Sequence, residues 1–167
     1  NILLSKAGEE FEEDVRDSLV DGGGELVDCE REPDEFAPDN STLQDALVKA
    51  VDASPSPSEP TIIYQASLVD YIGDWRVAGD VDLILVWSTL EGARVRVIDV
   101  KSASEEKTYH QVQAATYVDL LRTLVNGSGA LDRTDVVIDG GIVTRDDSLS
   151  SPTPVDLPSF DPDARIM

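Results

Sequence analysis

Two apolar runs typical of β-strands, each with an aspartate near one end, constrain the fold of this chain most. The first run covers residues 78–87, and the second leads into residues 97–102, Val-Ile-Asp-Val-Lys-Ser. Because side chains alternate across a strand, Asp99 and Lys101 lie on the same face of the second run. The segment between the runs, residues 88–93, contains a glycine and favours a hairpin connection. We therefore expect a hairpin whose open end carries acidic and basic side chains together.

A symmetric connection fixes the register of this hairpin. It predicts the pairs Trp87–Arg94, Val86–Val95, Ile84–Val97 and Asp82–Asp99. Apolar pairs then share a face with the acids, and on the other face the guanidinium group of Arg94 stacks on the indole of Trp87. Directly opposed side chains have Cβ atoms roughly 5 Å apart, and like charges at that separation destabilise a sheet. Asp82 and Asp99 therefore require a stabilising partner.

A divalent cation is the partner that we favour for these facing aspartates. Magnesium prefers hard oxygen ligands and typically uses one or two carboxylates, which leaves positions for water and a substrate phosphate. Asp82 and Asp99 supply the carboxylates, and Lys101 adds a positive donor beside them. A metal-bound water has a depressed pKa and can attack a phosphodiester near neutral pH. The predicted reaction is therefore phosphodiester hydrolysis, with the cation and the lysine stabilising the developing charge.

Three motifs, in this order, resemble those of the PD-(D/E)XK nucleases, and more closely those of their RecB-like exonuclease branch. Residues 79–82, Gly-Asp-Val-Asp, resemble the glycine-x-x-aspartate motif of that branch, and residues 99–101, Asp-Val-Lys, its acid-x-lysine motif. Residues 113–117, Gln-Ala-Ala-Thr-Tyr, resemble its glutamine-x-x-x-tyrosine helix motif. Each motif alone is weak, but all three in strand, strand and helix contexts make a strong signal. The resemblance covers roughly residues 6–145.

The resemblance implies an α/β fold with a restriction-endonuclease-like core, in which helices flank a mixed central β-sheet. It also implies a Mg²⁺- or Mn²⁺-dependent deoxyribonuclease. Glu12, in the family's first motif, would join Asp82 and Asp99 in gathering one or two ions. The backbone carbonyl of Val100 would complete the coordination sphere, and Lys101 would orient water or stabilise the phosphorane.

The substrate implied by the resemblance is DNA, because RecB-like relatives act chiefly on DNA ends or single strands. We therefore favour an exonuclease of DNA repair or recombination over a site-specific endonuclease. Gln113 and Tyr117 share a helix face at i and i+4 and would help to position the lysine and the DNA. Some relatives hold an iron–sulfur cluster with four cysteines, which this segment cannot do because Cys29 is its sole cysteine.

The first helix offers two candidate acids. Glu12 either points to the metal site or pairs with Arg16 one turn further on a solvated face. Glu9 is the second candidate for the same role. Phe11, Val15 and Leu19 recur at helical spacing and should form the buried stripe of this helix.

Three further side chains have both a functional and a structural interpretation. Gln65 either reaches the site or lines the core or a sheet edge, and Tyr117 either supports substrate or is a core aromatic. His110, the sole histidine, either contacts DNA or metal or is an exposed residue at a helix start. Lys107 has the same two interpretations.

The charge of the chain is unfavourable for a protein that approaches DNA. Acidic residues number 34 against 13 basic ones, for a net charge of −21. The chain is not a disordered acidic tail, since 41% of it is hydrophobic and falls in periodic blocks. The pattern is typical of a halophilic, haloarchaeal protein, in which molar salt screens repulsion over about 3 Å; a DNA mimic is the other interpretation. So few basic residues indicate that part of the DNA grip lies in a helicase partner or in further domains.

The chain has the length of one domain, which we place at residues 1–145 with an extended tail or linker at 146–167. Helices are expected over about 6–20, with Ser5 as cap, over 41–53 with Ser41 as cap, and from Ser104 or Thr108 to 126. Strands are expected over 25–29, 61–69, 75–85 and 135–144. The helix in a 30–60 insertion is expected to be peripheral. No membrane span or signal sequence is present, so a cytoplasmic protein is the default expectation.

Two other functions fit parts of the pattern. The nuclease fold can serve as a catalytically inactive DNA-binding or scaffolding module, although such a module would gain stability by losing the facing charges. A calcium-binding stability module would bind Ca²⁺ tightly and have no affinity for nucleic acid. Asp99→Ala separates the enzyme from the scaffold, because only the enzyme has metal-dependent cleavage to lose.

Overall fold

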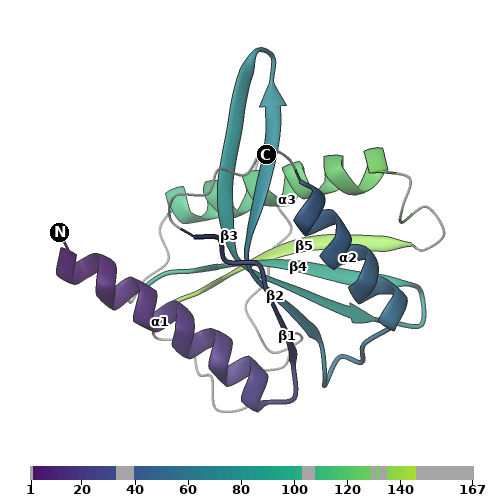
Figure 1. Ribbon diagram of the computed structural model, residues 1–167, viewed down its shortest axis with the longest axis horizontal. Coiled ribbons are helices and arrows are strands. Elements are labelled where there is room, and N and C mark those ends of the chain that lie inside the picture. Colours follow the sequence, from purple (N-terminus) through teal and green to yellow (C-terminus); the bar gives the residue numbers. More distant parts are fainter. Residues whose placement is uncertain (1, 33–39, 103–107, 129–130, 132–134, 146–167) are drawn as a thin grey trace.

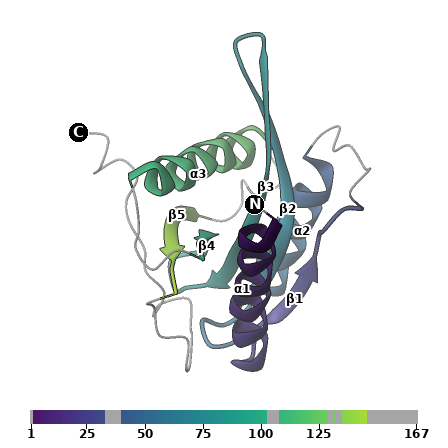
Figure 2. The same ribbon diagram turned by 90° about the vertical axis from the view of Figure 1, so that its left-hand side faces the viewer.

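The computed structural model describes residues 2–32, 40–102, 108–128, 131 and 135–145, and these form a mixed sheet flanked by helices (Figures 1 and 2). The described elements follow in the order α1 (Ile2–Asp21), β1 (Glu25–Asp28), α2 (Ser41–Ala53), β2 (Thr61–Ile72), β3 (Trp75–Ser88), β4 (Ala93–Val100), α3 (Thr108–Ser128) and β5 (Val136–Val143). The expected tail at 146–167, Ser104 and Lys107 lie outside the described residues.

The sheet has the strand order β1-β2-β3-β4-β5. The pairs β2–β3 and β3–β4 are antiparallel, whereas β1–β2 and β4–β5 are parallel. This arrangement confirms the expected α/β fold with a mixed central sheet. The register of the β3–β4 hairpin is also confirmed, since Trp87 pairs with Arg94, Val86 with Val95 and Ile84 with Val97.

One expected contact in this hairpin is wrong. The guanidinium carbon of Arg96, and not that of Arg94, lies over the ring of Trp87, 5.3 Å from its centroid. Arg94 instead donates to Asp139 Oδ2 at 2.7 Å, and Arg96 donates to both carboxylate oxygens of Asp139. Both arginines thus bond Asp139 of β5, and the guanidinium group over the indole belongs to the diagonal neighbour of Trp87 and not to its direct partner.

The helix starts differ from the expected caps. α1 begins at Ile2, so Ser5 lies inside it, because good helix formers precede the serine and extend the helix. α2 covers the expected residues, but the residue before it, Asn40, is at the N-cap position. The Asn40 side chain makes no cap bond there and instead bonds the backbone N and O of Val69, both at 2.6 Å.

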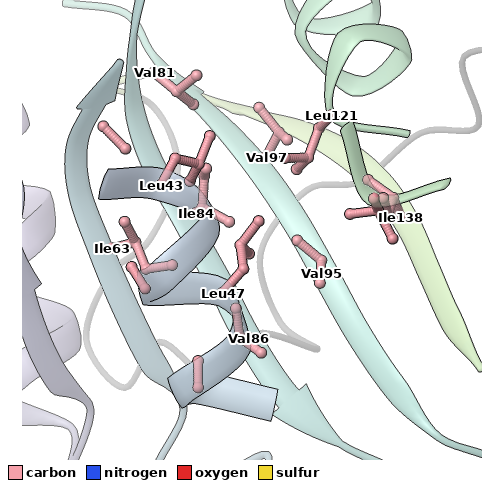
Figure 3. Packing of buried hydrophobic residues seen from close by; sticks show 14 of the residues in the cluster. Leu43, Leu47, Ile63, Val81, Ile84, Val86, Val95, Val97, Leu121 and Ile138 are labelled. Atoms are coloured by element: carbon pink, nitrogen blue, oxygen red, sulfur yellow. The ribbon is translucent and has the colours of Figure 1, made fainter. Parts of the chain in front are cut away.

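Apolar side chains form a cluster on each face of the sheet. α2 and α3 cover one face, where Leu43, Leu47 and Leu121 pack on strand residues such as Ile84 and Val97 (Figure 3). On the other face, Val15 and Leu19 of α1 join a second cluster, as the periodicity of this helix predicts. α2, which belongs to the expected 30–60 insertion, thus supplies much of the main core.

β2 and β3 continue beyond the rest of the sheet as a two-stranded arm (Figure 1). We call residues 66–81 the arm; its last pairs are Tyr71–Arg76 and Ile72–Trp75. No described helix is both long and apolar enough to cross a lipid bilayer.

Candidate active site

The junction between the arm and the sheet contains an irregularity shared by β2 and β3. Ile63 and Ala66 are three residues apart yet belong to the same cluster, and so do Val81 and Ile84. Side-chain alternation therefore shifts by one residue in both strands, at Gln65 and opposite it at Asp82. Gln65 has φ of 55°, a left-handed value that is costly for a residue other than glycine.

Asp82 stands where β3 and β4 stop pairing. The last backbone pair of the hairpin is Leu83–Ile98, one step before Asp82 and Asp99. At the next step the Asp82 carboxylate replaces a backbone acceptor, since the amide of Val100 donates to its Oδ2 at 2.7 Å. The end of the strand ladder thus places an acidic side chain, and not a peptide group, beside β4.

Asp99 and Lys101 lie on one face of β4, as their spacing predicts. Lys101 Nζ is 3.1 Å from Asp99 Oδ1 and donates to Gln113 Oε1 of α3 at 3.2 Å. Asp99 is only 3% exposed, and its Oδ2 is buried without a hydrogen-bond partner. A buried, unpartnered carboxylate oxygen is costly, because it has lost water and gained nothing in exchange.

Glu12 reaches this junction from α1. Its Oε2 accepts a 2.7 Å hydrogen bond from Gln65 Nε2, while Glu9 is exposed. Arg16 does not pair with Glu12; it donates to Asp17 and lies 4.7 Å from the centroid of the Tyr64 ring. Of the two candidate acids on α1, the structure therefore turns Glu12 inward.

Arg145, which the sequence interpretation left unassigned, holds α1 against the end of β4. It donates to the backbone oxygens of Ser102 at 2.6 Å and Ala7 at 3.3 Å. Its guanidinium carbon lies 5.2 Å from the centroid of the Phe11 ring. This clamp positions the helix turn that carries Glu12.

Burial raises the pKa of each of the three inward acids. Burial, followed by the negative charge of Glu12, raises the pKa of Asp82 to about 8. Burial also raises the pKa of Asp99, against the opposing effects of Lys101 and of the neighbouring Asp82 carboxyl. The pKa of Glu12 is raised by burial and by Asp99, again opposed by Lys101. Asp82 thus responds to both Glu12 and Asp99, and Glu12 responds to Asp99, as expected of carboxylates that share one site.

Residues of α3 close the site from the other side. A Cβ on Gly79 would come within 2.5 Å of the Tyr117 hydroxyl oxygen, so only glycine lets this tyrosine lie against β3. His110 is 3% exposed and stacks edge-on with Tyr109. Its interpretation as an exposed helix-start residue is wrong, because the residue is buried.

The structure brings together the residues of the predicted site to different degrees. The carboxyls of Asp82 and Asp99 meet, Lys101 contacts Asp99, and Gln113 contacts Lys101. In the described part of the chain, no group of three or more His, Cys, Asp or Glu side chains is already arranged to hold a metal ion, so the metal role of Glu12 stays a prediction. The amide of Val100 donates to Asp82, and the metal-binding role of its carbonyl stays a prediction.

The sequence analysis does not predict two features of the site, the backbone conformation of Gln65 and the packing role of Gly79. The left-handed backbone of Gln65 has no signal in residue type, because glycine and asparagine are the usual residues there. The role of Gly79 has a signal, since a glycine inside a strand often marks the close approach of another group. Gln65 itself was an open candidate, and its bond to Glu12 places it at the site.

Comparison with known proteins agrees with this geometry. The model of the PD-(D/E)XK nuclease superfamily matches residues 9–147, which include Glu12, the aspartate pair, the lysine and the α3 motif. No curated protein and no solved structure matches the chain.

Proposed function

The chain belongs to the PD-(D/E)XK nuclease superfamily, and from this membership we propose that it is a Mg²⁺- or Mn²⁺-dependent deoxyribonuclease of the RecB-like exonuclease type. The observation that carries the proposal is the buried pair of Asp82 and Asp99, in which Asp99 Oδ2 has no hydrogen-bond partner. A site built for a cation explains why two acids with raised pKa values share one place.

The residues fit a hard divalent cation. Two carboxylates, one of them with an unused oxygen, are the usual protein contribution to a magnesium site. Asp82 and Asp99 would hold the ion, Glu12 would add a third carboxylate, and the Val100 carbonyl lies at the same strand end. The bound cation supplies charge neutralisation and a nucleophilic water of lowered pKa.

Side chains of the protein would stabilise charge on the substrate and hold the other site residues in position. Lys101 would move its ammonium group from the aspartate towards a substrate phosphate, where it stabilises developing negative charge. Gln113 keeps that group in reach by its hydrogen bond, and Gln65 orients Glu12 in the same way. Tyr117 and His110 would support the substrate from α3.

The RecB-like assignment is supported by how the three motifs contact one another. Gly79 of the first motif touches Tyr117 of the third, and Lys101 of the second touches Gln113 of the third. The motifs thus form one connected unit. We propose that this unit trims DNA ends or single strands in repair or recombination, with a helicase or further domains supplying part of the DNA grip.

An assay on end-labelled single-stranded and duplex DNA tests the nuclease proposal. We expect cleavage with Mg²⁺ or Mn²⁺ at high KCl, none in EDTA, and none by Asp99→Ala under any condition. Cleavage that persists in Asp99→Ala, or that is absent from the wild type with both metals, contradicts the proposal.

Binding of the metal can be measured without cleavage. Mn²⁺ should raise the melting temperature of the wild type, and Asp82→Asn should lose this rise. Asp80→Asn is the matched control on the same strand, because Asp80 accepts hydrogen bonds from Arg31 and Ser67 and not from the site.

A further inference from the structure

The arm rises directly from the candidate site. Between the pairs Ala66–Val81 and Ile72–Trp75 its two strands pair with no other described strand, because β1 pairs with β2 no further than Tyr64. On the other edge, β4 pairs with β3 no further than Leu83. At a rise of about 3.3 Å per residue, the tip stands roughly 20 Å from the junction that holds Asp82.

Contacts near its root hold the arm in place. Arg31 donates to Ser67 Oγ at 2.6 Å and to Asp80 Oδ1 at 2.9 Å, which ties both strands to the segment after β1. The Asn40 side chain bonds both backbone groups of Val69. The arm is therefore a preorganised extension of the sheet.

The outer half of the arm carries two aromatic side chains that are exposed to solvent. Trp75 is 80% exposed and Tyr71 is 62% exposed. Tyr71 pairs across the strands with Arg76, which is also exposed. Trp75 therefore presents its indole ring to solvent at the tip of the arm.

We propose that the tip of the arm binds the strand on which the site acts, with Trp75 stacking on an unpaired base. The proposal rests on the nuclease function, because it assigns the substrate of that site to single strands or unpaired ends. Trp75, at the tip, and Asp82, at the root, belong to one strand, so a nucleic acid strand that follows the arm reaches both.

Charge favours stacking over phosphate binding. Within residues 66–81, three aspartates (Asp70, Asp74 and Asp80) stand against one arginine, Arg76. The whole chain carries a net charge of −21, so attraction to phosphates is weak. Stacking of a base on an aromatic ring needs no cation and tolerates every base, but it requires a base face that a duplex does not expose.

Intrinsic fluorescence reports on the tip, because the two tryptophans differ in exposure. Trp75 is 80% exposed, whereas Trp87 is 4% exposed under Arg96. The full chain is titrated in EDTA with an oligothymidine of about 16 nucleotides, a length that covers the arm. We expect saturable quenching that persists at high KCl, because stacking releases few counterions.

Labelled oligothymidine measures the affinity of variants. Trp75→Ala should raise the Kd about 5- to 150-fold, the effect of losing one base–aromatic stack. Trp75→Phe should retain most of the affinity. Leu90→Ala is the matched control, since Leu90 is a fully exposed apolar side chain in the turn at the other end of β3 and should leave the Kd unchanged. Circular dichroism and melting temperature confirm that each variant folds.

The outcomes separate this inference from the nuclease function. Any of three results overturns the role of the arm: no quenching of Trp75, an unchanged Kd in Trp75→Ala, or equally tight binding of a blunt duplex. If the wild type still cleaves DNA with metal, the nuclease function stands. Quenching by the strand in a protein that cleaves no DNA with either metal keeps strand binding and overturns the nuclease.

Discussion

Gln65 combines a left-handed backbone with a hydrogen bond to the inward acid of α1. The two features can be separated by mutation. Gln65→Ala keeps the strained backbone and loses the bond to Glu12, whereas Gln65→Gly loses the bond but relieves the strain. We expect the glycine variant to be more stable than the alanine variant by about 1 kcal/mol, with both impaired in Mn²⁺-dependent cleavage. Urea denaturation measures the difference, and equal stabilities would show that the backbone at this position is unstrained.

The pKa of Asp82 makes stability depend on pH in metal-free buffer. This pKa rises from 3.8 to about 8 on folding, so the folded state holds a proton that the unfolded state releases. Stability from this group is therefore complete below pH 4 and is lost as the pH rises towards 8, by at most about 4 kcal/mol between pH 5 and pH 8. Chemical denaturation in EDTA across this range should show the fall.

Asp82→Asn is the control for this pH dependence. It removes the titrating group but keeps an oxygen that can accept the bond from the Val100 amide. The slope of stability against pH should flatten in the variant, and Mn²⁺ should flatten it in the wild type. A slope that is the same in the wild type and in Asp82→Asn would assign the titration to another group.

At the scale of elements, Gly79 and Tyr117 set how closely the arm approaches α3. Gly79→Ala would place a methyl group 2.5 Å from the tyrosine hydroxyl, while the next ring atoms are 3.2 Å away. We expect a cost of about 1–3 kcal/mol, the range for overpacking a tight contact. Tyr117→Phe removes the closest atom, so the double variant should recover part of this loss. Additive effects in a double-mutant cycle would mean that the two residues do not interact.

The hairpin shows how far local sequence rules reach. Its register followed from a symmetric connection, and three of its pairs were confirmed, because side-chain period and turn length leave few alternatives. Arg94 and Arg96 both bond Asp139 of β5, more than 40 residues away in the chain, and Arg96 lies over Trp87. Contacts with a distant strand leave no trace in the local pattern.

The candidate site also combines features that the local sequence predicts with features that depend on distant contacts. The shared face of Asp99 and Lys101 was predictable from the alternation of β4, whereas Asp82 lies where the alternation of β3 shifts. The inward turn of Glu12 was not, since it depends on Gln65, and the Gln65 backbone departs from the normal conformation of its residue type. The burial of His110 was likewise beyond local rules, because it depends on how α3 lies against the sheet.

For the molecule as a whole, the excess of acidic residues sets the response to salt. At a net charge of −21 the folded chain repels itself, and the Debye length falls from about 10 Å at 0.1 M salt to 3 Å at 1 M. We expect a gain of about 2 kcal/mol over this range of KCl, or roughly 4–8 °C in melting temperature. Scanning calorimetry in EDTA measures the rise, and sucrose at equal osmolality controls for exclusion of solute from the protein surface. A melting temperature that rises equally in sucrose would remove charge screening as the cause.

The turn at residues 89–92 decides which side chain of β4 stands beside Asp82, although it lies at the opposite end of the strands. Adding or deleting one residue there would shift the pairing and turn Asp99 towards the face covered by α1. Descendants of one ancestral gene could therefore exchange the side chains of this turn freely, yet keep its length. Among related chains we expect substitutions in this turn but no insertions or deletions, so its length should be inherited as strictly as the acids.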